Sequence, residues 1–343
     1  MVSKDLVFSI LKLLSKRLLY AFITIMIAAS VTFVAIRSMP GDIIYALASS
    51  LAEELRIPLE EARKIVYHMY YGIDIEKPLY VQYIEYVLGL LQGNLGYSTY
   101  FKRPVTYVVA RALGWTVFTL SIGIALSFAL GVLLGMIAGF KRGGKIDSFI
   151  SMISSIISAI PGYAIALVFY IILSARLGLL PAGGAYSAYV TPGFNLSFII
   201  DVFYHAALPI ITYVFITFSS WTLLIRSNVA KILEEDFLKY AEARGISRRR
   251  IVTSYIGRNS ILPLIPLLAL RIGGMIGGST LIETIFAYPG MGYYLSIALS
   301  IRDYGLLQGI FFMMILTTII GMIIVEVITP FIDPRIRREV VAA

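Results

Sequence analysis

Six long apolar runs constrain what this chain can fold into more than any other feature. An α-helix needs about 17–25 residues to cross the roughly 30 Å hydrocarbon core of a bilayer, and each run is that long. The runs are residues 18–36, 115–140, 148–175, 206–225, 260–282 and 304–325. They lack the alternation of apolar and polar residues that marks membrane β-strands. The sequence therefore predicts an all-α polytopic membrane protein with six transmembrane helices.

The amino-acid composition agrees with this fold class and excludes several classes of function. Of the 343 residues, 59% are hydrophobic and 14% are charged, whereas about 25% of the residues in a soluble protein are charged. The chain has no cysteine, which excludes disulfides, thiol catalysis and thiolate metal sites. Its two histidines, His68 and His205, are too few for a histidine-rich metal site. We therefore expect this chain to bind no metal and no cofactor.

The distribution of basic residues predicts the topology. Most of the 29 lysines and arginines lie in the N-terminal tail, the loop after the second run, the loop 227–259 and the C-terminal tail. Such segments face the cytosol in membrane proteins, whereas the charges of a long loop such as 37–114 count little. We therefore expect both termini in the cytosol of a cell-membrane protein. The net charge of +9 reflects this topology and not nucleic-acid binding.

This topology divides the chain into a short series of segments. They are a cytoplasmic N-terminal tail (1–17), transmembrane helix 1 (18–36), an external loop (37–114), a core with transmembrane helices 2–6 (115–330) that includes a cytoplasmic loop (227–259), and a cytoplasmic C-terminal tail (331–343). In the external loop, helical patterns run from Pro58 to Gly72 and from Pro78 to Gly93, which predicts two amphipathic helices. These helices are either a structural cap or a surface for an external partner.

The chain lacks the sequence signatures of common hydrolases. It has no Gly-x-x-x-x-Gly-Lys-Ser/Thr phosphate loop, no His-Glu-x-x-His and no Gly-x-Ser-x-Gly. We therefore assign no catalytic residue and expect no ATPase site in this chain.

Polar and small residues inside the spans point to a pore or a subunit interface. Arg271 lies near the middle of the fifth run, where a charge marks a partner or a water-filled path, and Glu283 and Glu326 are its candidate partners. Glycines spaced four apart let helices approach closely, either within the chain or at a subunit interface or pore. In the second run they are Gly131, Gly135 and Gly139. In the fifth run they are Gly273, Gly274, Gly277 and Gly278, which with Arg271 and Glu283 are our candidate pore or interface residues.

A short charged segment in the loop 227–259 stands out in this apolar chain. It starts with Glu234, Glu235 and Asp236, which suit the positive end of a helix dipole, and it ends at Gly245, which suits a helix stop. Phe237, Ala241 and Gly245 are four apart and share one face, which predicts a docking face for another protein. The alternative is a solvated linker helix.

A second helix is expected directly after this segment. Ser247 is placed to cap it, and Leu262-Pro263 leads from it into the fifth run. A push on the charged helix would therefore reach a membrane helix.

These residues carry a resemblance to a known family. Residues 236–247, followed by Arg258-Asn259 and Leu262-Pro263, resemble the EAA loop of ABC importer permeases, in the form found in the dipeptide/oligopeptide permease family. Tyr255 and Arg271 depart from the pattern, because many relatives have histidine and a neutral polar residue there. Further stretches are similar to the family in the same order, namely 37–42, 93–98 with 103–105, 177–184, 283–292 and 333–337.

The resemblance implies the type I importer permease fold and a role as one transmembrane subunit of an importer. Its implied partners are a second homologous permease in a heterodimer, two cytoplasmic ATPases that hold ATP and Mg²⁺, and an external substrate-binding protein. The implied cargo is a peptide or an oligosaccharide. The residues implied to couple this chain to an ATPase are Asp236, Phe237, Tyr240, Ala241, Glu242, Ala243, Arg244 and Gly245.

Two other classes of function compete with this interpretation. A stand-alone channel or secondary transporter would use Arg271 and Glu326 as an ion or proton site. An intramembrane enzyme would need paired polar residues that the spans do not offer. Transport by the purified chain without ATPases would favour the channel.

Overall fold

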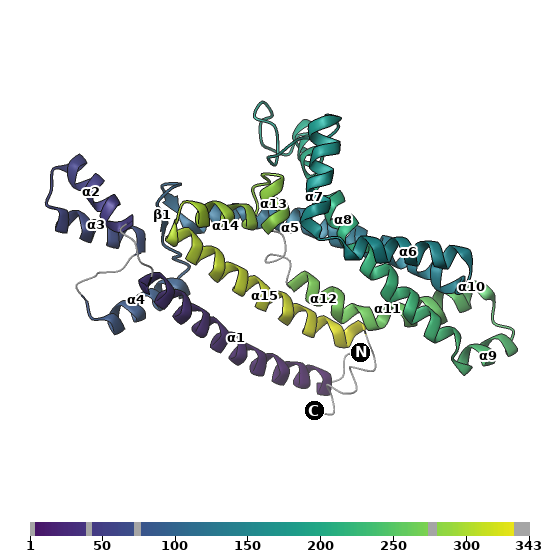
Figure 1. Cartoon of the computed structure of the whole chain (residues 1–343). Coiled ribbons are helices and arrows are strands. Elements are labelled where there is room, and N and C mark those ends of the chain that lie inside the picture. Colours follow the sequence, from purple (N-terminus) through teal and green to yellow (C-terminus); the bar gives the residue numbers. More distant parts are fainter. Residues whose placement is uncertain (1–3, 39–42, 72–76, 274–279, 333–343) are drawn as a thin grey trace.

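The structure of the chain is a computed structural model that describes residues 4–38, 43–71, 77–273 and 280–332 (Figure 1). These residues are almost entirely helical. The first elements are α1 (Lys4–Ser38), α2 (Ile43–Leu55), α3 (Leu59–Tyr71), α4 (Leu79–Leu91), β1 (Tyr97–Ser98) and β2 (Arg103–Pro104). The central ones are α5 (Val105–Phe140), α6 (Lys145–Ala159), α7 (Gly162–Phe169), the π-helical η1 (Tyr170–Arg176) and α8 (Leu196–Leu233).

The last third of the chain begins with a series of short helices. They are α9 (Asp236–Ala243), α10 (Arg248–Arg250), the π-helical η2 (Ile251–Gly257), α11 (Arg258–Ile261), the 3-10 turn η3 (Leu262–Leu264) and α12 (Ile265–Gly273). The remaining elements are α13 (Thr280–Ile285), α14 (Met291–Ser300) and α15 (Tyr304–Ile332).

The all-α membrane fold predicted from the sequence is confirmed. Four helices among the described residues are long and apolar enough to cross a membrane. They are α5, α8, the continuous helical stretch Arg248–Ile272, and α15 over Tyr304–Ile324. The third predicted span breaks at Pro161, where α6 and the helix Gly162–Arg176 meet at 95°. The first predicted span lies within α1, whose apolar part Leu18–Val34 is shorter than the other candidates.

Proline sets the start of several helices. Each of α3, α4, α5 and α7 begins directly after a proline. Proline has no N–H to donate and disfavours helical geometry in the residue before it, so a helix does not extend backward past it. The two amphipathic helices predicted after Pro58 and Pro78 are confirmed as α3 and α4. Sequence reasoning missed α2, which packs against α3 through Ala48, Ala62 and Val66.

The centre of the fold is the close pairing of α5 with α8. A Cβ added at Gly131 would lie 2.3 Å from Trp221 Cβ, and one added at Gly135 would lie 2.6 Å from the Thr222 carbonyl oxygen. A Cβ added at Gly139 would lie 2.6 Å from Val229 Cβ. The glycines of the second run therefore serve packing within the chain, which decides between the two roles considered for them.

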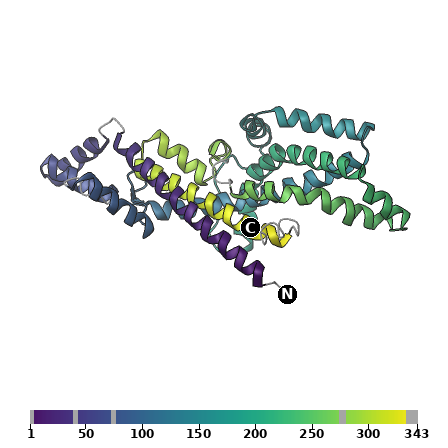
Figure 2. The same ribbon diagram turned by 90° about the horizontal axis from the view of Figure 1, so that it is seen from below.

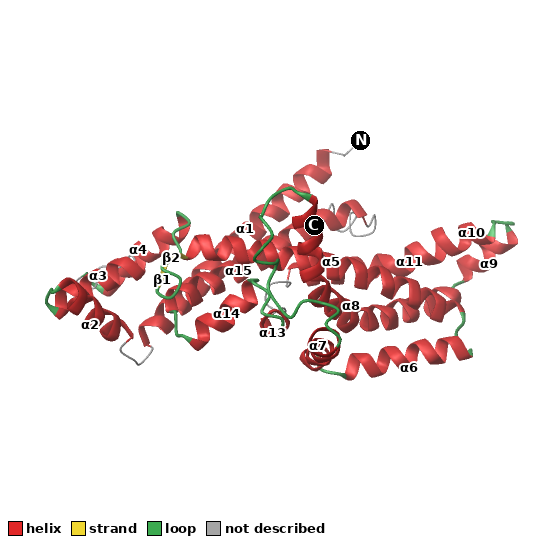
Figure 3. Cartoon of the chain, turned by 90° about the horizontal axis from the view of Figure 1, so that it is seen from above, coloured by secondary structure: helices red, strands yellow, loops and turns green. Residues whose placement is uncertain are grey.

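The elements form an elongated molecule with distinct ends. α9 and α10 lie at one end, while α2, α3 and β1 lie at the other (Figures 1 and 3). α1 packs along α15, and the start of α1 and the end of α15 both lie toward the end that carries α9 (Figure 2). The turn between α5 and α6 lies at that end as well.

A buried aspartate holds the strand hairpin at the opposite end. Asp303 Oδ2 accepts hydrogen bonds from Ser98 Oγ at 2.5 Å and from the Tyr100 N–H at 3.1 Å. Its Oδ1 accepts from the Leu306 N–H at 3.0 Å in the first turn of α15, where a carboxylate is favoured by the helix dipole. Asp303 therefore fixes the hairpin of β1 and β2 to the last membrane helix, α15.

Candidate functional site

Helix α9 is the charged segment predicted from the sequence. Glu235 is its N-cap residue, and Asp236 lies in its first turn, where acidic side chains complement the helix dipole. Gly245 has φ +67, a left-handed conformation that glycine adopts without strain. The N–H of Ile246 bonds to the Ala241 carbonyl oxygen at 3.2 Å, which closes the helix in the way expected for a glycine stop.

The faces of α9 differ from the prediction. Leu238 and Ala241 are 6% and 3% exposed and pack into a core cluster with Trp221 and Ile251. The prediction that Ala241 belongs to an exposed docking face is therefore wrong. Residue 241 follows 238 by three positions, and these two residues form the buried stripe.

The outward surface of α9 is centred on Tyr240. Its side chain is 71% exposed, and Phe237 beside it is 39% exposed and stacks on the Tyr255 ring at 6.4 Å. Asp236, Glu242, Ala243, Arg244 and Gly245 are exposed as well. An exposed aromatic pair surrounded by charges is typical of a protein contact surface, because aromatic residues dominate the centres of interfaces.

A continuous helical rod follows α9. It starts after Ser247, which occupies the expected cap position without a side-chain cap bond, and it runs through α10, η2, α11, η3 and α12. Asn228 of α8 donates its Nδ2–H to the Ser260 carbonyl oxygen at 3.0 Å. α9 thus packs through its buried face on η2, which is itself part of the candidate membrane span Arg248–Ile272.

An ion pair fastens the α5–α6 turn to the end of α8 beside this rod. Asp147 is 2% exposed and forms a bidentate contact with Arg226, in which Nη2 donates to Oδ2 at 2.8 Å. The Gly143 N–H donates to Asp147 Oδ2 at 2.9 Å. Arg142 pairs with Glu234 on the surface nearby.

We predict that Asp147→Asn loosens this end of the core formed by α5, α6 and α8. The cost should be about 2–3 kcal/mol, below the roughly 3–5 for fully buried pairs, because the Arg226 side chain is 32% exposed. Thermal unfolding of the detergent-solubilised chain measures it, with a lower Tm expected. Asp147→Asn with Arg226→Gln should recover part of the loss, since no charge is left unpaired. An unchanged Tm in the single variant would show that the pair contributes nothing.

Glu283 is a structural residue in this chain. It is fully buried, and its carboxylate accepts hydrogen bonds from Thr116 Oγ1 at 2.8 Å and from the Gly292 N–H at 2.7 Å. It therefore joins α5, α13 and the first turn of α14, where the helix dipole favours a carboxylate. Burial, and secondarily the nearby Glu283 carboxylate, raise the pKa of the Tyr288 phenol above its usual range. The prediction that Glu283 lines a pore or subunit interface is wrong, because its side chain faces the interior of the chain.

Arg271 has a different environment. Its guanidinium carbon lies 5.2 Å from the Trp221 ring centroid, and its Nη2 is 3.5 Å from Ser220 Oγ. The side chain is exposed on α12, and the cation–π contact offsets part of the cost of a charge at that depth. Its place at a pore or partner surface stays a prediction. The side chain of Glu326 lies outside the described residues, as do Gly274, Gly277 and Gly278, while Gly273 ends α12.

Comparison with known proteins decides the family of this chain. The family described as "Binding-protein-dependent transport system inner membrane component" matches residues 131–338, a range that contains α9, the rod and α15. The chain belongs to this family. Among its relatives, the "Glutathione transport system permease protein GsiC" of Salmonella typhimurium is 27% identical over 334 residues, or 94% of this chain and 97% of the relative.

Two further relatives cover almost as much. The "Oligopeptide transport system permease protein AppB" of Bacillus subtilis is 27% identical over 306 residues, or 89% of this chain and 92% of the relative. The "Di/tripeptide transport system permease protein DppB" of Pseudomonas aeruginosa is 28% identical over 327 residues, or 90% and 93%. This chain is therefore a multi-pass permease subunit of an ABC transporter in the inner membrane, and it forms part of a translocation path. Its family implies ATPases and a substrate-binding protein as partners.

Proposed function

We propose that this permease forms half of the path through which an ATP-driven importer takes up peptides. The peptide class is supported by the names of similar permeases, which are those of oligopeptide, di/tripeptide and glutathione transport systems. The second half is a homologous permease in a heterodimer, and an external binding protein delivers the peptide. Both termini and α9 face the cytosol, as the positive-inside rule predicts. Two partner ATPases bind ATP and Mg²⁺, while this chain hydrolyses nothing.

In this proposal α9 is the coupling helix that sits on one ATPase. The observation that carries it is the unbroken rod from Arg248 to Gly273 beside α9. A displacement of α9 by ATPase closure moves η2, on which it packs, and with it the membrane helix α12. Because every residue from Arg248 to Gly273 is helical, no loop interrupts the rod between η2 and α12, and a displacement at one end can reach the other.

We predict that Tyr240→Ala weakens ATPase binding without unfolding the permease. Tyr240 is 71% exposed, so truncation opens no cavity in this chain. Aromatic anchors at interface centres cost about 2 kcal/mol or more on truncation, which corresponds to more than about tenfold in affinity. Co-purification of the ATPases with the permease pair measures this loss.

Tyr240→Phe is the matched control, because it keeps the ring and removes only the hydroxyl. It should bind the ATPases nearly as well as the wild type. If Tyr240→Ala leaves both ATPase association and substrate-stimulated ATP hydrolysis unchanged, α9 is not the coupling helix.

A further inference from the structure

A row of basic and aromatic residues begins α5 at the end of the molecule away from α9. Arg103, Tyr107, Arg111 and Trp115 are four apart, so from the helix start onward they share one face. The guanidinium carbons of Arg103 and Arg111 lie 5.2 and 5.7 Å from the Tyr107 ring centroid. Arg111 also donates an Nη1–H to Tyr107 Oη at 3.0 Å. The phenol ring thus holds two guanidinium groups close together.

This row lines one side of a cavity of about 400 Å³. Tyr186 from the loop before α8 and Tyr294 from α14 line other parts of it. The volume lies within the roughly 300–1,000 Å³ of typical small-molecule sites. The lining combines aromatic walls with a few charged groups, the composition that such sites favour.

The cavity carries an uncompensated positive charge. Among its lining residues Arg103 and Arg111 are charged, and no aspartate or glutamate lines it. Neither arginine takes part in an ion pair among the described residues. Two like charges in one concave site raise the local potential, which an anion relieves. A carboxylate is the anion that matches the planar fork of a guanidinium group.

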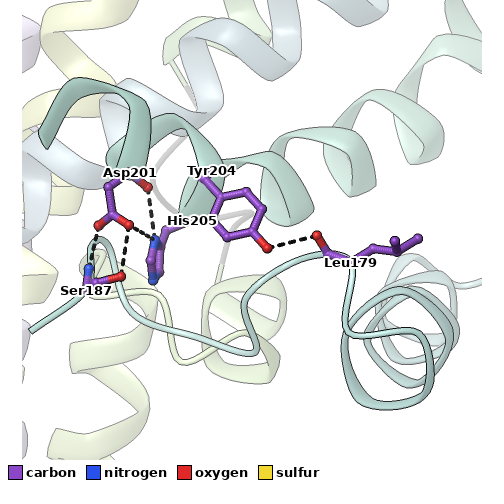
Figure 4. A network of polar contacts seen from close by, with 5 residues as sticks. All are labelled: Leu179, Ser187, Asp201, Tyr204 and His205. Carbon is purple, nitrogen blue, oxygen red and sulfur yellow. Dashed lines mark hydrogen bonds and ion pairs between the residues drawn. The ribbon is translucent and has the colours of Figure 1, made fainter. Parts of the chain in front are cut away.

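The cavity walls are fixed in place before any ligand arrives. Tyr186 contacts the rings of Trp115 and Phe198 at 6.1 and 5.3 Å. Its neighbour Ser187 donates its backbone N–H and its hydroxyl to the Asp201 carboxylate of α8, at 2.6 and 2.8 Å (Figure 4). Tyr204 also binds the Leu179 carbonyl oxygen at 3.0 Å (Figure 4). A preorganised site loses less entropy when a ligand binds.

We propose that this cavity binds the terminal carboxylate of a peptide on its way into the path. The inference rests on the proposed import of peptides and adds the chemical group by which the permease itself recognises them. Arg111 and Arg103 hold the carboxylate, and the rings of Tyr186, Tyr294 and Trp115 pack against the adjoining part of the peptide. A peptide whose terminus is amidated lacks this charge and loses the contact.

The test compares two tripeptides in the complete importer. Proteoliposomes that contain both permeases, the ATPases and the binding protein receive either trialanine or trialanine amide, and ATP-dependent uptake is measured. The quantity of interest is the uptake ratio of acid to amide, because selection by the unchanged binding protein cancels when two permease variants are compared. Arg111→Gln should lower this ratio by about tenfold, the usual loss for one charged hydrogen bond.

Two further variants make the result specific. Arg111→Lys keeps the charge without the planar fork and should lower the ratio by less than Arg111→Gln. Arg176→Gln removes an exposed arginine at the end of η1 that does not line the cavity, and it should leave the ratio unchanged.

Several outcomes would overturn the inference. An unchanged ratio in Arg111→Gln, with uptake intact, would show that the cavity does not read the carboxylate, while peptide import itself would stand. If Arg111→Gln lowers the uptake of acid and amide equally and also weakens association with the binding protein, the group that Arg111 contacts belongs to the binding protein and not to the peptide. If the wild type imports neither tripeptide with ATP, peptide import fails and this inference fails with it.

Discussion

Gly135→Leu is expected to prevent the permease from reaching its folded state. A Cβ at this position would lie 2.6 Å from the Thr222 carbonyl oxygen and 2.7 Å from Ile225 Cβ. Both atoms belong to the α8 scaffold and not to the tip of a flexible side chain, so α5 and α8 must separate to make room. This pairing also carries the contacts at Gly131 and Gly139, and a local shift would disturb all of them. Overpacking one rigid contact costs about 1–3 kcal/mol, and a leucine adds several carbons to it.

Three substitutions on α5 should change the stability of the permease by different amounts. Gly135→Ala should lower stability by about 2–3 kcal/mol and reduce Tm, whereas Gly135→Leu should remove the monodisperse peak in gel filtration after membrane extraction. Gly114→Leu is the matched control, since a Cβ there has nothing within 4 Å. It should fold and gain up to about 1 kcal/mol from helix propensity. Normal folding of Gly135→Leu would mean that α5 and α8 do not pack as described.

Local signals let the sequence predict where some elements start and stop. Pro58 and Pro78 mark the starts of α3 and α4 because proline acts on its own backbone and on its neighbour. Gly245 marks the end of α9 for a similar reason, since its left-handed conformation is a local property. These effects of proline and glycine act within a few residues, so the residue type alone is enough to predict them.

The apolar runs in the sequence do not predict the full length of the membrane helices. The apolar runs begin at residues 115 and 206, whereas α5 and α8 start at Val105 and Leu196. Arg111 and Asp201 interrupt the apolar pattern but not the helices, because a helix that projects beyond the hydrocarbon can carry charged residues. An apolar run therefore measures the depth of the bilayer and not the length of the helix.

Tertiary contacts account for the remaining differences. Glu283 lies at the edge of the fifth run, and nothing in its neighbourhood in sequence identifies Thr116 as its partner. The two residues are 167 positions apart, so the sequence alone predicts a pore residue where the fold places a buried carboxylate. The sequence predicts the wrong exposed face for α9 for the same reason, because the core cluster that covers Ala241 includes Trp221 and Ile251 from other helices. The position of Asp303 directly before Tyr304 is enough to predict that it caps α15, since aspartate is a preferred N-cap residue.

Ser254→Pro is expected to separate ATPase binding from transport. Ser254 is exposed in η2, the part of the rod on which α9 packs, and α11, η3 and the membrane helix α12 follow it. Proline removes a backbone donor and kinks a helix, at a cost of about 3 kcal/mol or more. The outward face of α9 around Tyr240 is untouched, so the ATPases should still bind. Uptake should fall by roughly tenfold or more, within the range of coupling free energies of about 1–3 kcal/mol.

Ser254→Ala is the control, because it removes the same hydroxyl and keeps the helix continuous. It should transport like the wild type, and its Tm should match that of the wild type. In Ser254→Pro, ATP hydrolysis should continue while its stimulation by the loaded binding protein is lost, since the displacement of α9 no longer reaches α12. Normal uptake by a folded Ser254→Pro permease would exclude the rod as the connection. Loss of ATPase binding together with uptake would instead make the rod a support that holds α9 in place, and the transmission of force would have to follow α8.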